Sequence, residues 1–408
     1  MKRPSLVRLS PVFLLALALF TSSCARHAPT APDAARGARS SASTSLSAVA
    51  SGVAAQAEST LEGDIGPGAH YVISVPEGWN GELVLYAHGY TAPIFPVGLP
   101  PGEEPLVEGL RTLALQRGYA FAYSSYSQTG LGLKDAALRT DQLANLFASL
   151  VGRPHRTFLI GTSFGALAAL KLVEAHPERY EGLLTLGGMI GGVQAEVDYV
   201  SNVRVLFDYF YPGVLRGTLL ELPPDFNLQA EVMDSVAAAI QAHPEPALAL
   251  SQVTQTPIPF SNGIELATSI ISALSLQAVE LQDILARTHG QSFFDNTHTI
   301  YTGNLPPEVL ADLNAHVARY SEGPAAARLL EKEYGPTGDL RVPMVSLHTS
   351  LDPVVPIFHE DLYRSLVEAH GAGANLHQTR IDRYGHVAFT PEEIVGAFGQ
   401  MIALAATP

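Results

Sequence analysis

Cysteine is nearly absent from this chain, which has one cysteine among 408 residues. A single cysteine cannot form a disulfide bond within the chain, so a fold held together by disulfides is excluded. Charged residues are also scarce, at 15%, whereas 47% of the residues are hydrophobic. This composition excludes a disordered chain and predicts a globular protein with a large core.

Basic clusters and metal-binding patterns are missing as well. The chain carries 24 Lys and Arg residues against 39 Asp and Glu, a formal net charge of -15, without a basic stripe, so we expect no nucleic-acid partner. There is no His-Glu-x-x-His pair and no carboxylate loop with metal-binding spacing, and the glycines of segment 187–192 lack the Gly-x-Gly-x-x-Gly spacing of a dinucleotide site. We therefore expect neither a metal ion nor another cofactor.

The N-terminus has the pattern of an export signal. Basic residues precede an apolar run at residues 12–20 that is too short to span a bilayer. Small residues then lead to Cys24, which resembles a bacterial lipoprotein processing site. We expect a signal peptide over residues 1–24, a lipid on Cys24 that tethers the protein to a membrane, and a flexible Ala- and Ser-rich linker over residues 25–59. Secretion without a lipid is the alternative.

From about residue 60, short β-branched or apolar runs alternate with helical patterns. This alternation predicts a mainly parallel sheet with helices on both faces, formed by residues 60–192 and 340–408. The expected strands are residues 70–75, 82–87, 120–124, 157–160, 182–186, 343–347 and 374–381. The expected helices are residues 106–117, 134–151, 164–175, 355–369 and 391–405.

Residues 193–339 interrupt this alternation. A connection between two neighbouring strands is usually far shorter, so the segment is an insertion. Within it, residues 234–242, 264–287 and 306–317 have helical patterns separated by Pro and Gly. We expect a helical cap over the functional site, and a separate helical domain without a catalytic role is the alternative.

The segment around Ser163 carries the strongest chemical signal. Residues 157–170 read Thr-Phe-Leu-Ile-Gly-Thr-Ser-Phe-Gly-Ala-Leu-Ala-Ala-Leu, which is a strand, a Gly-x-Ser-x-Gly turn and a helix of small residues. Such a turn needs glycines, exposes the serine hydroxyl at the carboxyl edge of the sheet and aims the helix N-terminus at it. Ser163 is therefore the predicted nucleophile, and a helix-capping serine is the alternative.

A serine hydroxyl needs a general base, and the base needs an acid that orients it. His386 is the predicted base because it lies on a loop between the last expected strand and the C-terminal helix. Asp352 is the predicted acid because it follows a buried strand and precedes His386 by about 34 residues, in the order Ser, Asp, His. Asp382 is the rival acid, although it lies in or at the edge of the last strand.

The strand that ends in Ala87-His88-Gly89-Tyr90 completes the predicted site. We expect the backbone N–H groups of Tyr90 and Phe164 to form an oxyanion hole, and His88 to brace this loop. His88, Tyr126 and Tyr209 are the candidate substrate-pocket residues. Packing within the insertion is the alternative for the aromatic residues there.

These segments, in this order, resemble the α/β-hydrolase superfamily over residues 61–192 and 340–405. The resemblance implies an α/β-hydrolase fold, with a mostly parallel central sheet flanked by helices and the cap inserted between strands 6 and 7. The segments Trp79-Asn80-Gly81, Gly385-His386 and Phe389-Thr390 also look similar to exported bacterial hydrolases of esterase type. This implies a serine hydrolase that acts by acyl transfer on a small-molecule ester or a short acylated compound.

Two other functions stay open. An exported serine peptidase of the same fold would hold a substrate ammonium group on acidic cap residues, for which the sequence offers Glu196, Asp198, Asp208 and Glu221. A non-catalytic binding protein is the second, because a fold does not determine a function. The sequence does not indicate an oligomeric state.

Overall fold

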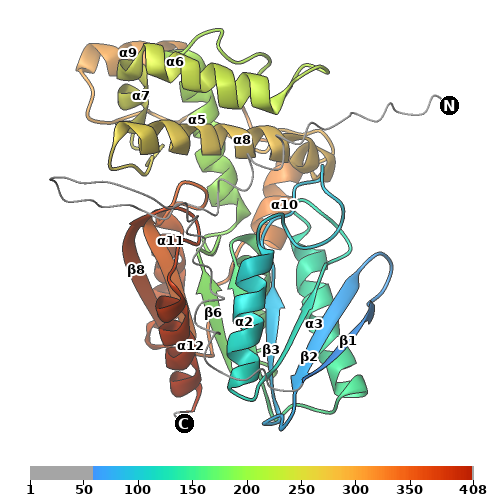
Figure 1. Cartoon of the computed structure of the whole chain (residues 1–408). Coiled ribbons are helices and arrows are strands. Elements are labelled where there is room, and N and C mark those ends of the chain that lie inside the picture. Colours follow the sequence, from blue (N-terminus) through green and yellow to red (C-terminus); the bar gives the residue numbers. More distant parts are fainter. Residues whose placement is uncertain (1–57, 407–408) are drawn as a thin grey trace, which may run out of the picture.

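The computed structural model describes residues 58–406, which form an eight-stranded sheet with helices around it (Figure 1). The strands are β1 (Glu58–Asp64), β2 (His70–Pro76), β3 (Glu82–Ala87), β4 (Ala120–Ser124), β5 (Arg156–Thr162), β6 (Gly182–Leu186), β7 (Met344–Leu351) and β8 (Leu376–Tyr384). They lie in the order β1-β2-β4-β3-β5-β6-β7-β8. β2 pairs antiparallel with β1 and β4, and every pair from β4 to β8 is parallel.

Hydrophobic cores lie on both faces of the sheet. Along β3, Leu83 and Leu85 belong to one core and Val84 and Tyr86 to the other, because successive side chains in a strand point to opposite faces. The helices α3 (Leu133–Leu150), α4 (Phe164–Ala175) and α11 (Phe358–Ala369) cover the first face, and α2 (Glu104–Gln116) and α12 (Pro391–Ala405) cover the second. Strands buried on both faces read as continuous apolar runs, which is why the sequence marks them well.

The edge strand β1 differs from the expected organisation. It begins at Glu58, so the last two residues of the expected linker are paired in the sheet, from Glu58 opposite Pro76 to Asp64 opposite His70. Its sequence, Glu-Ser-Thr-Leu-Glu-Gly-Asp, is polar and largely exposed, and the backbone pairing with β2 alone makes it a strand. The expected signal peptide, Cys24 and the linker up to residue 57 lie outside the described residues.

The insertion between β6 and β7 is helical, as expected. It contains α5 (Val193–Phe210), the π-helix η3 (Gln229–Val236), α6 (Ala237–Ala242), α7 (Pro244–Ser251), α8 (Gly263–Arg287), α9 (Pro307–His316) and α10 (Pro324–Tyr334). Figure 1 shows most of these helices as a layer above the upper end of the sheet, with α5 leading into it from β6. The long helix α8 packs against α5, η3, α6 and α7 and is the centre of this layer.

Among the described residues, α8 is also the one helix long and apolar enough to cross a membrane. It has 25 residues and a mean hydropathy of 1.4 over its most apolar stretch, of which 56% is buried inside the protein. A helix at the centre of a folded layer has the same character, because it is apolar on several sides. The packing of α8 against four neighbouring helices accounts for its composition.

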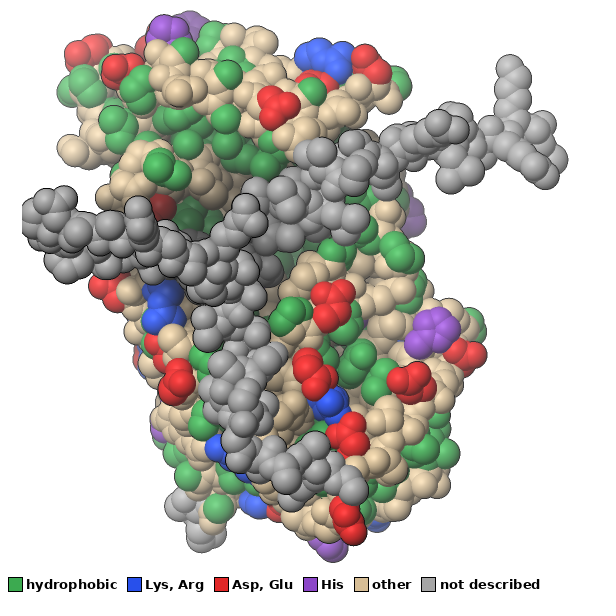
Figure 2. Space-filling view, viewed as in Figure 1, with side chains coloured by type: hydrophobic (Ala, Val, Ile, Leu, Met, Phe, Trp, Pro, Cys, Tyr) green, Lys and Arg blue, Asp and Glu red, His purple; other side chains and the backbone are tan. Residues whose placement is uncertain are grey.

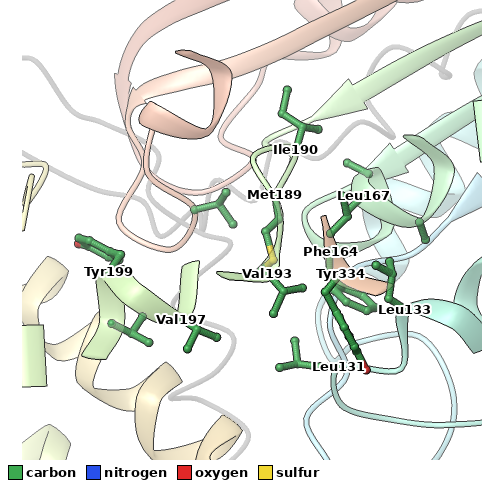
Figure 3. Close-up of a cluster of buried hydrophobic side chains, with 14 of the residues drawn as sticks. Leu131, Leu133, Phe164, Leu167, Met189, Ile190, Val193, Val197, Tyr199 and Tyr334 are labelled. Atoms are coloured by element: carbon green, nitrogen blue, oxygen red, sulfur yellow. The ribbon is translucent and has the colours of Figure 1, made fainter. Parts of the chain in front are cut away.

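The cap and the sheet share one core. Figure 3 shows Val193 of α5 close to Phe164, the first residue of α4, together with Met189 and Tyr334, and Val197 farther along α5. All five side chains belong to the same buried cluster, and each is less than a tenth exposed. The first turns of the cap therefore pack against the helix that carries Ser163.

Acidic side chains outnumber basic ones on the surface. On the face drawn in Figure 2, Lys and Arg side chains are few and scattered among Asp and Glu, over both the cap and the sheet domain. This matches the formal net charge of -15.

Candidate active site

Ser163 lies at the turn between β5 and α4 in a backbone conformation that is rare for a residue with a side chain (φ 53°, ψ -123°). Its two neighbouring glycines make the turn possible. A Cβ atom at Gly165 would lie 2.2 Å from carbonyl oxygens at the end of β3, and one at Gly161 would lie 2.5 Å from Cα of Ala166. The Gly-x-Ser-x-Gly pattern therefore has a steric cause, because the turn is packed directly against β3 and against its own helix.

Asp352 directly follows β7 and His386 closely follows β8, so both lie at the edge of the sheet where β5 ends at Ser163. Nδ1 of His386 is 2.8 Å from Oδ2 of Asp352. The other oxygen, Oδ1, accepts the N–H groups of Val354 and Val355 at 2.9 and 3.0 Å. The carboxylate is fully buried, whereas 10% of the His386 side chain is exposed. Since Nδ1 is held by Asp352, Nε2 is the ring atom that is left for a reacting proton.

The end of β6 connects this pair with Ser163. The backbone N–H of Ser163 donates to the carbonyl oxygen of Leu186 at 3.1 Å. A Cβ atom at the next residue, Gly187, would lie 3.4 Å from Cε1 of His386 and 3.5 Å from Oδ2 of Asp352. The structure thus brings the three predicted residues to one edge, although the Ser163 hydroxyl has no hydrogen-bond partner among the described residues. Such contacts are often open when no substrate is bound.

The rival acid, Asp382, faces elsewhere. It lies in β8, is exposed, and accepts a hydrogen bond from Oγ of Ser350 at 3.1 Å. Nδ1 of His386 is bound by Asp352, so Asp382 does not orient this ring in the structure.

The two residues predicted to supply the oxyanion hole lie next to each other. The rings of Tyr90 and Phe164 meet edge to face, with centroids 6.4 Å apart and an angle of 81° between their planes. Phe164 is the first residue of α4, so its N–H is one of those that an α-helix leaves without a partner inside the helix. The positive end of the helix dipole lies at the same place and favours a developing negative charge.

Glu103 supports the loop before Tyr90 and was not found from the sequence. Both of its carboxylate oxygens accept the N–H of Gly89, at 3.1 Å each, and the hydroxyl of Tyr86 also donates to it. Burial raises the pKa of Glu103 to about 7, against the hydrogen bonds from Tyr86 and Gly89 that lower it. A Cβ atom at Gly89 would lie 3.5 Å from Cβ of Ser163, so this carboxyl group holds the loop at the reacting edge.

His88 and Tyr126 brace the same loop from below. Their rings are stacked with centroids 3.8 Å apart, and the Tyr126 hydroxyl donates to the carbonyl oxygen of His88 at 3.0 Å. Nδ1 of His88 is 2.8 Å from the carbonyl oxygen of Gly89, and burial lowers the pKa of His88 to about 4. The histidine is therefore neutral near neutral pH, which fits the expected bracing role. A part in the substrate pocket stays a prediction for both residues.

The structure does not bring Tyr209 to this group. Its hydroxyl donates to Oδ2 of Asp312 at 2.6 Å and so links α5 to α9 within the cap. It lies 13 residues beyond Glu196 on the same helix, which corresponds to about 20 Å along the axis. Tyr209 thus matches the packing alternative.

Two buried histidines near Asp352 were not singled out from the sequence. Nδ1 of His348 is 3.1 Å from Oε1 of Glu360, and Nε2 of His359 is 3.0 Å from Oε2 of Glu196. All four side chains are at most 1% exposed. No group of three or more His, Cys, Asp or Glu side chains within residues 58–406 is arranged to hold a metal ion.

No family model and no curated protein matches this sequence. Similar solved structures include an esterase of Pyrococcus furiosus (10% identity over 90% of this chain and 96% of that one, TM-score 0.45). Another is Candida antarctica lipase A, with 17% identity over 83% of this chain and 74% of that one and a TM-score of 0.41. A third is a serine hydrolase involved in carbazole degradation, with 11% identity over 85% of this chain and 100% of that one and a TM-score of 0.39. The strand order, the turn at Ser163 and the helical insertion after β6 are features of the chain itself. On these features, the protein has the α/β-hydrolase fold with a helical cap between β6 and β7.

Proposed function

We propose that this protein is a serine hydrolase that cleaves carboxylic esters through an acyl-enzyme intermediate. The observation that carries the proposal is the hydrogen bond of 2.8 Å between His386 and Asp352 at the edge of the sheet where Ser163 occupies its strained turn. A helix-capping role does not account for Ser163, because its side chain forms no capping hydrogen bond to α4. A strained backbone occurs often at active sites, where the strain is kept because the residue reacts.

In the proposed reaction, Oγ of Ser163 attacks the ester carbonyl and gives its proton to Nε2 of His386. The N–H groups of Tyr90 and Phe164 stabilise the oxyanion, and Asp352 stabilises the imidazolium ring that forms. His386 then donates the proton to the leaving alcohol, which leaves the acyl group on Ser163. Water, deprotonated by the same histidine, attacks the acyl-enzyme and releases the acid.

The acidic residues of the cap do not favour the peptidase alternative. Asp208 is held by Nε of Arg204 at 2.9 and 3.0 Å, Asp198 accepts a hydrogen bond from a glutamine on its own helix, and Glu221 is exposed. Glu196 is the one of these four that interacts with Asp352 and His386, and burial together with the charge of Asp352 raises its pKa well above the usual value. A neutral carboxyl group binds an ammonium group weakly, so an uncharged ester fits the environment of Glu196 better than a peptide with a free N-terminus does.

The test compares nitrophenyl esters of several acyl lengths with aminoacyl and tripeptidyl anilides, with Ser163→Ala as the control. We expect ester turnover that the control lacks. Full activity in Ser163→Ala would contradict the catalytic role of Ser163. Faster turnover of the anilides would replace the ester by a peptide as the substrate, and binding without turnover in the wild type would favour a non-catalytic protein.

We also propose that the protein is exported and tethered to a membrane through a lipid on Cys24. The support is the basic and apolar pattern of residues 1–24. The test is expression of the full chain in a bacterium, followed by partition between detergent and aqueous phases. The wild type is expected in the detergent phase and Cys24→Ser in the aqueous phase; equal partition of the two would contradict the lipid anchor.

A further inference from the structure

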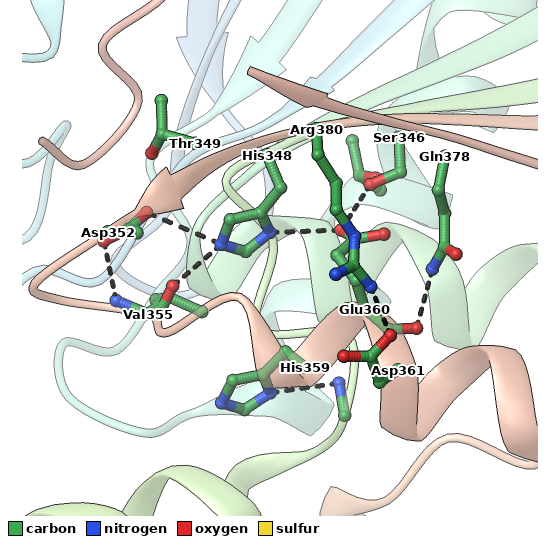
Figure 4. Close-up of polar contacts among 12 residues, drawn as sticks. Ser346, His348, Thr349, Asp352, Val355, His359, Glu360, Asp361, Gln378 and Arg380 are labelled. Carbon is green, nitrogen blue, oxygen red and sulfur yellow. Dashed lines mark hydrogen bonds and ion pairs between the residues drawn. The ribbon is translucent and has the colours of Figure 1, made fainter. Parts of the chain in front are cut away.

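Asp352 has a second histidine behind it. Nε2 of His348 is 3.6 Å from Oδ2 of Asp352, which is the same oxygen that binds His386. Both side chains are fully buried. Figure 4 shows His348 between Asp352 on one side and Glu360 on the other, with Val355 in contact with the same ring. On the side away from His386, the carboxylate of Asp352 therefore faces the polar ring of a buried histidine.

The hydrogen bonds of His348 indicate its protonation state. Nε2 is 2.7 Å from the carbonyl oxygen of Val355, which can only accept, so this nitrogen carries a proton. Nδ1 is 3.1 Å from Oε1 of Glu360, and the same oxygen accepts the hydroxyl of Ser346 at 2.6 Å. An ionised Glu360 accepts both of these bonds, and the ring is then an imidazolium with both N–H groups bound.

The electrostatics point in the same direction. Burial disfavours the charged ring, but the hydrogen bond and the charge of Glu360, together with the charge of Asp352, raise the pKa of His348. A buried ion pair persists where its partners are held in good geometry, and Glu360 is held from α11 while His348 is held from β7.

We propose that His348, as an imidazolium held by Glu360, is a positioning residue for Asp352 and His386. It rests on the proposed function. The cation lies behind Asp352, 3.6 Å from Oδ2, and helps to hold this carboxylate in place by charge attraction. It also offsets part of the negative charge that favours a proton on His386. A general base must be unprotonated to act, so the cation extends the range of pH over which His386 is ready to accept a proton.

The other titratable groups around this cluster do not supply such a charge. Gly191 donates its N–H to Nδ1 of His359 at 3.1 Å, so Nε2 of that ring carries the proton and donates to Glu196. Burial lowers the pKa of His359 to about 3, so the ring is neutral. Three other titratable groups interact with Asp352: the carboxyl group of Glu196 and the phenol of Tyr199 on α5, and the phenol of Tyr384 on β8. The pKa of each is raised above its usual value, which favours the uncharged form.

The experiment follows His386 directly in the full chain labelled with nitrogen-15 histidine. The NMR titration midpoint of His386 is measured in the wild type, His348→Gln and the double variant His348→Gln/Glu360→Gln, with His386→Asn to assign the signal. We expect His348→Gln to raise the midpoint by about one pH unit, because removal of a nearby cation favours the protonated ring. The double variant is expected to raise it by less, because it also removes the negative charge of Glu360 on the other side of His348. In the pH profile of kcat/KM on an ester, the midpoint of the acid limb is expected to rise by the same amount as the His386 midpoint. For a rise of one pH unit, kcat/KM falls about tenfold at pH values well below that midpoint.

The matched control is His359→Gln. It replaces a histidine that is equally buried and also pairs with a glutamate, but that is neutral. We expect no shift of the His386 midpoint in this variant. The double variant removes both charges together and leaves no unpaired ion in the core, so it tests the proposal even where His348→Gln alone does not fold.

A folded double variant with an unchanged His386 midpoint would overturn the proposal, as would a nitrogen-15 spectrum in which His348 is neutral near pH 7. A uniform fall of activity at all pH values, without a shift, would show a purely structural role and would equally contradict it. The two NMR outcomes do not depend on turnover. A wild type without esterase activity would refute the proposed function and leave the titration to decide the inference on its own.

Discussion

Two carboxylates of the sheet domain and the polar side chains in the first turns of the cap differ in how they are held. In the sheet domain, both oxygens of Asp352 are bound, and Glu103 is held by Gly89 and Tyr86. In the cap, the first turns of α5 bury Oε1 of Glu196, the hydroxyl of Tyr199 and Oγ of Ser201 without partners among the described residues. The sheet domain also buries atoms without a partner among the described residues, namely Nε2 of His88, the hydroxyl of Tyr90 and Oε2 of Glu360. Asp352 and Glu103 are thus held by hydrogen bonds, whereas the start of the cap keeps several polar atoms with unused hydrogen-bonding capacity.

The largest effect is expected from a substitution at the edge of the sheet. Ser163→Ala removes the nucleophile and is expected to lower kcat on a nitrophenyl ester on the order of 10⁵-fold, with little change in Tm. The measurement pairs steady-state kinetics with thermal unfolding. A fall of less than tenfold would mean that ester cleavage occurs elsewhere in the molecule.

Asp352→Asn is expected to lower kcat about 10⁴-fold, because an amide no longer orients the ring or stabilises the imidazolium. Asp382→Asn is the matched control. This residue is exposed and bonded to Ser350, so its substitution is expected to change kcat less than about twofold. The reverse ranking of these two variants would identify Asp382 as the acid.

Glu103→Gln tests how the sheet domain holds its oxyanion loop. The pKa of Glu103 is raised to about 7 in the folded protein, so the fold favours the protonated carboxyl group. The protonated group stabilises the fold fully at pH values below the pKa of the unfolded chain. This contribution is lost as the pH rises through about 7. From pH 5 to pH 8 the wild type is therefore expected to lose stability relative to the variant, on the order of 2–3 kcal/mol.

Chemical denaturation of the wild type and Glu103→Gln at the two pH values gives this difference. Glu104→Gln is the control, since that neighbour is largely exposed. A difference between wild type and Glu103→Gln that stays constant with pH would mean that the carboxyl group keeps one protonation state throughout.

The smallest effect is expected in the cap. Burial and the charge of Asp352 raise the pKa of Glu196 well above its usual value, which favours the protonated form, and that form resembles a glutamine. Glu196→Gln is therefore expected to change kcat/KM on a neutral ester less than about threefold. The same variant assayed on an aminoacyl anilide sharpens the comparison, because a loss of more than tenfold there would show that the cap holds an ammonium group.

The parts of the fold that the sequence predicted share one physical cause. β3, β4 and β6 are buried on both faces, and their expected bounds agree with the structure to the residue. β1 was missed because its residues are polar, and pairing with β2 is what makes it a strand. The helix α5 was missed because it is rich in valine and aromatic residues, which have low helix propensity, and packing against α8 overrides that preference.

The site divides in the same way. Ser163 is predicted from a local motif, and Asp352 and His386 from their places after strands and from chain order, and the structure brings all three to the same edge of the sheet. Glu103 and Glu360 carry no local signal, because each acts on a residue of another element that the fold brings near it. Their roles become visible only when the tertiary contacts are known.

The backbone of Ser163 also limits how stable this protein can be. A non-glycine residue with a φ of 53° is strained, and such strain costs about 1–3 kcal/mol. Glycine adopts the same conformation without that strain, so a protein selected for stability alone would replace the serine. The proposed nucleophile is thus a point where the fold is weakened, and variants selected only for heat resistance are expected to lose activity at this position first.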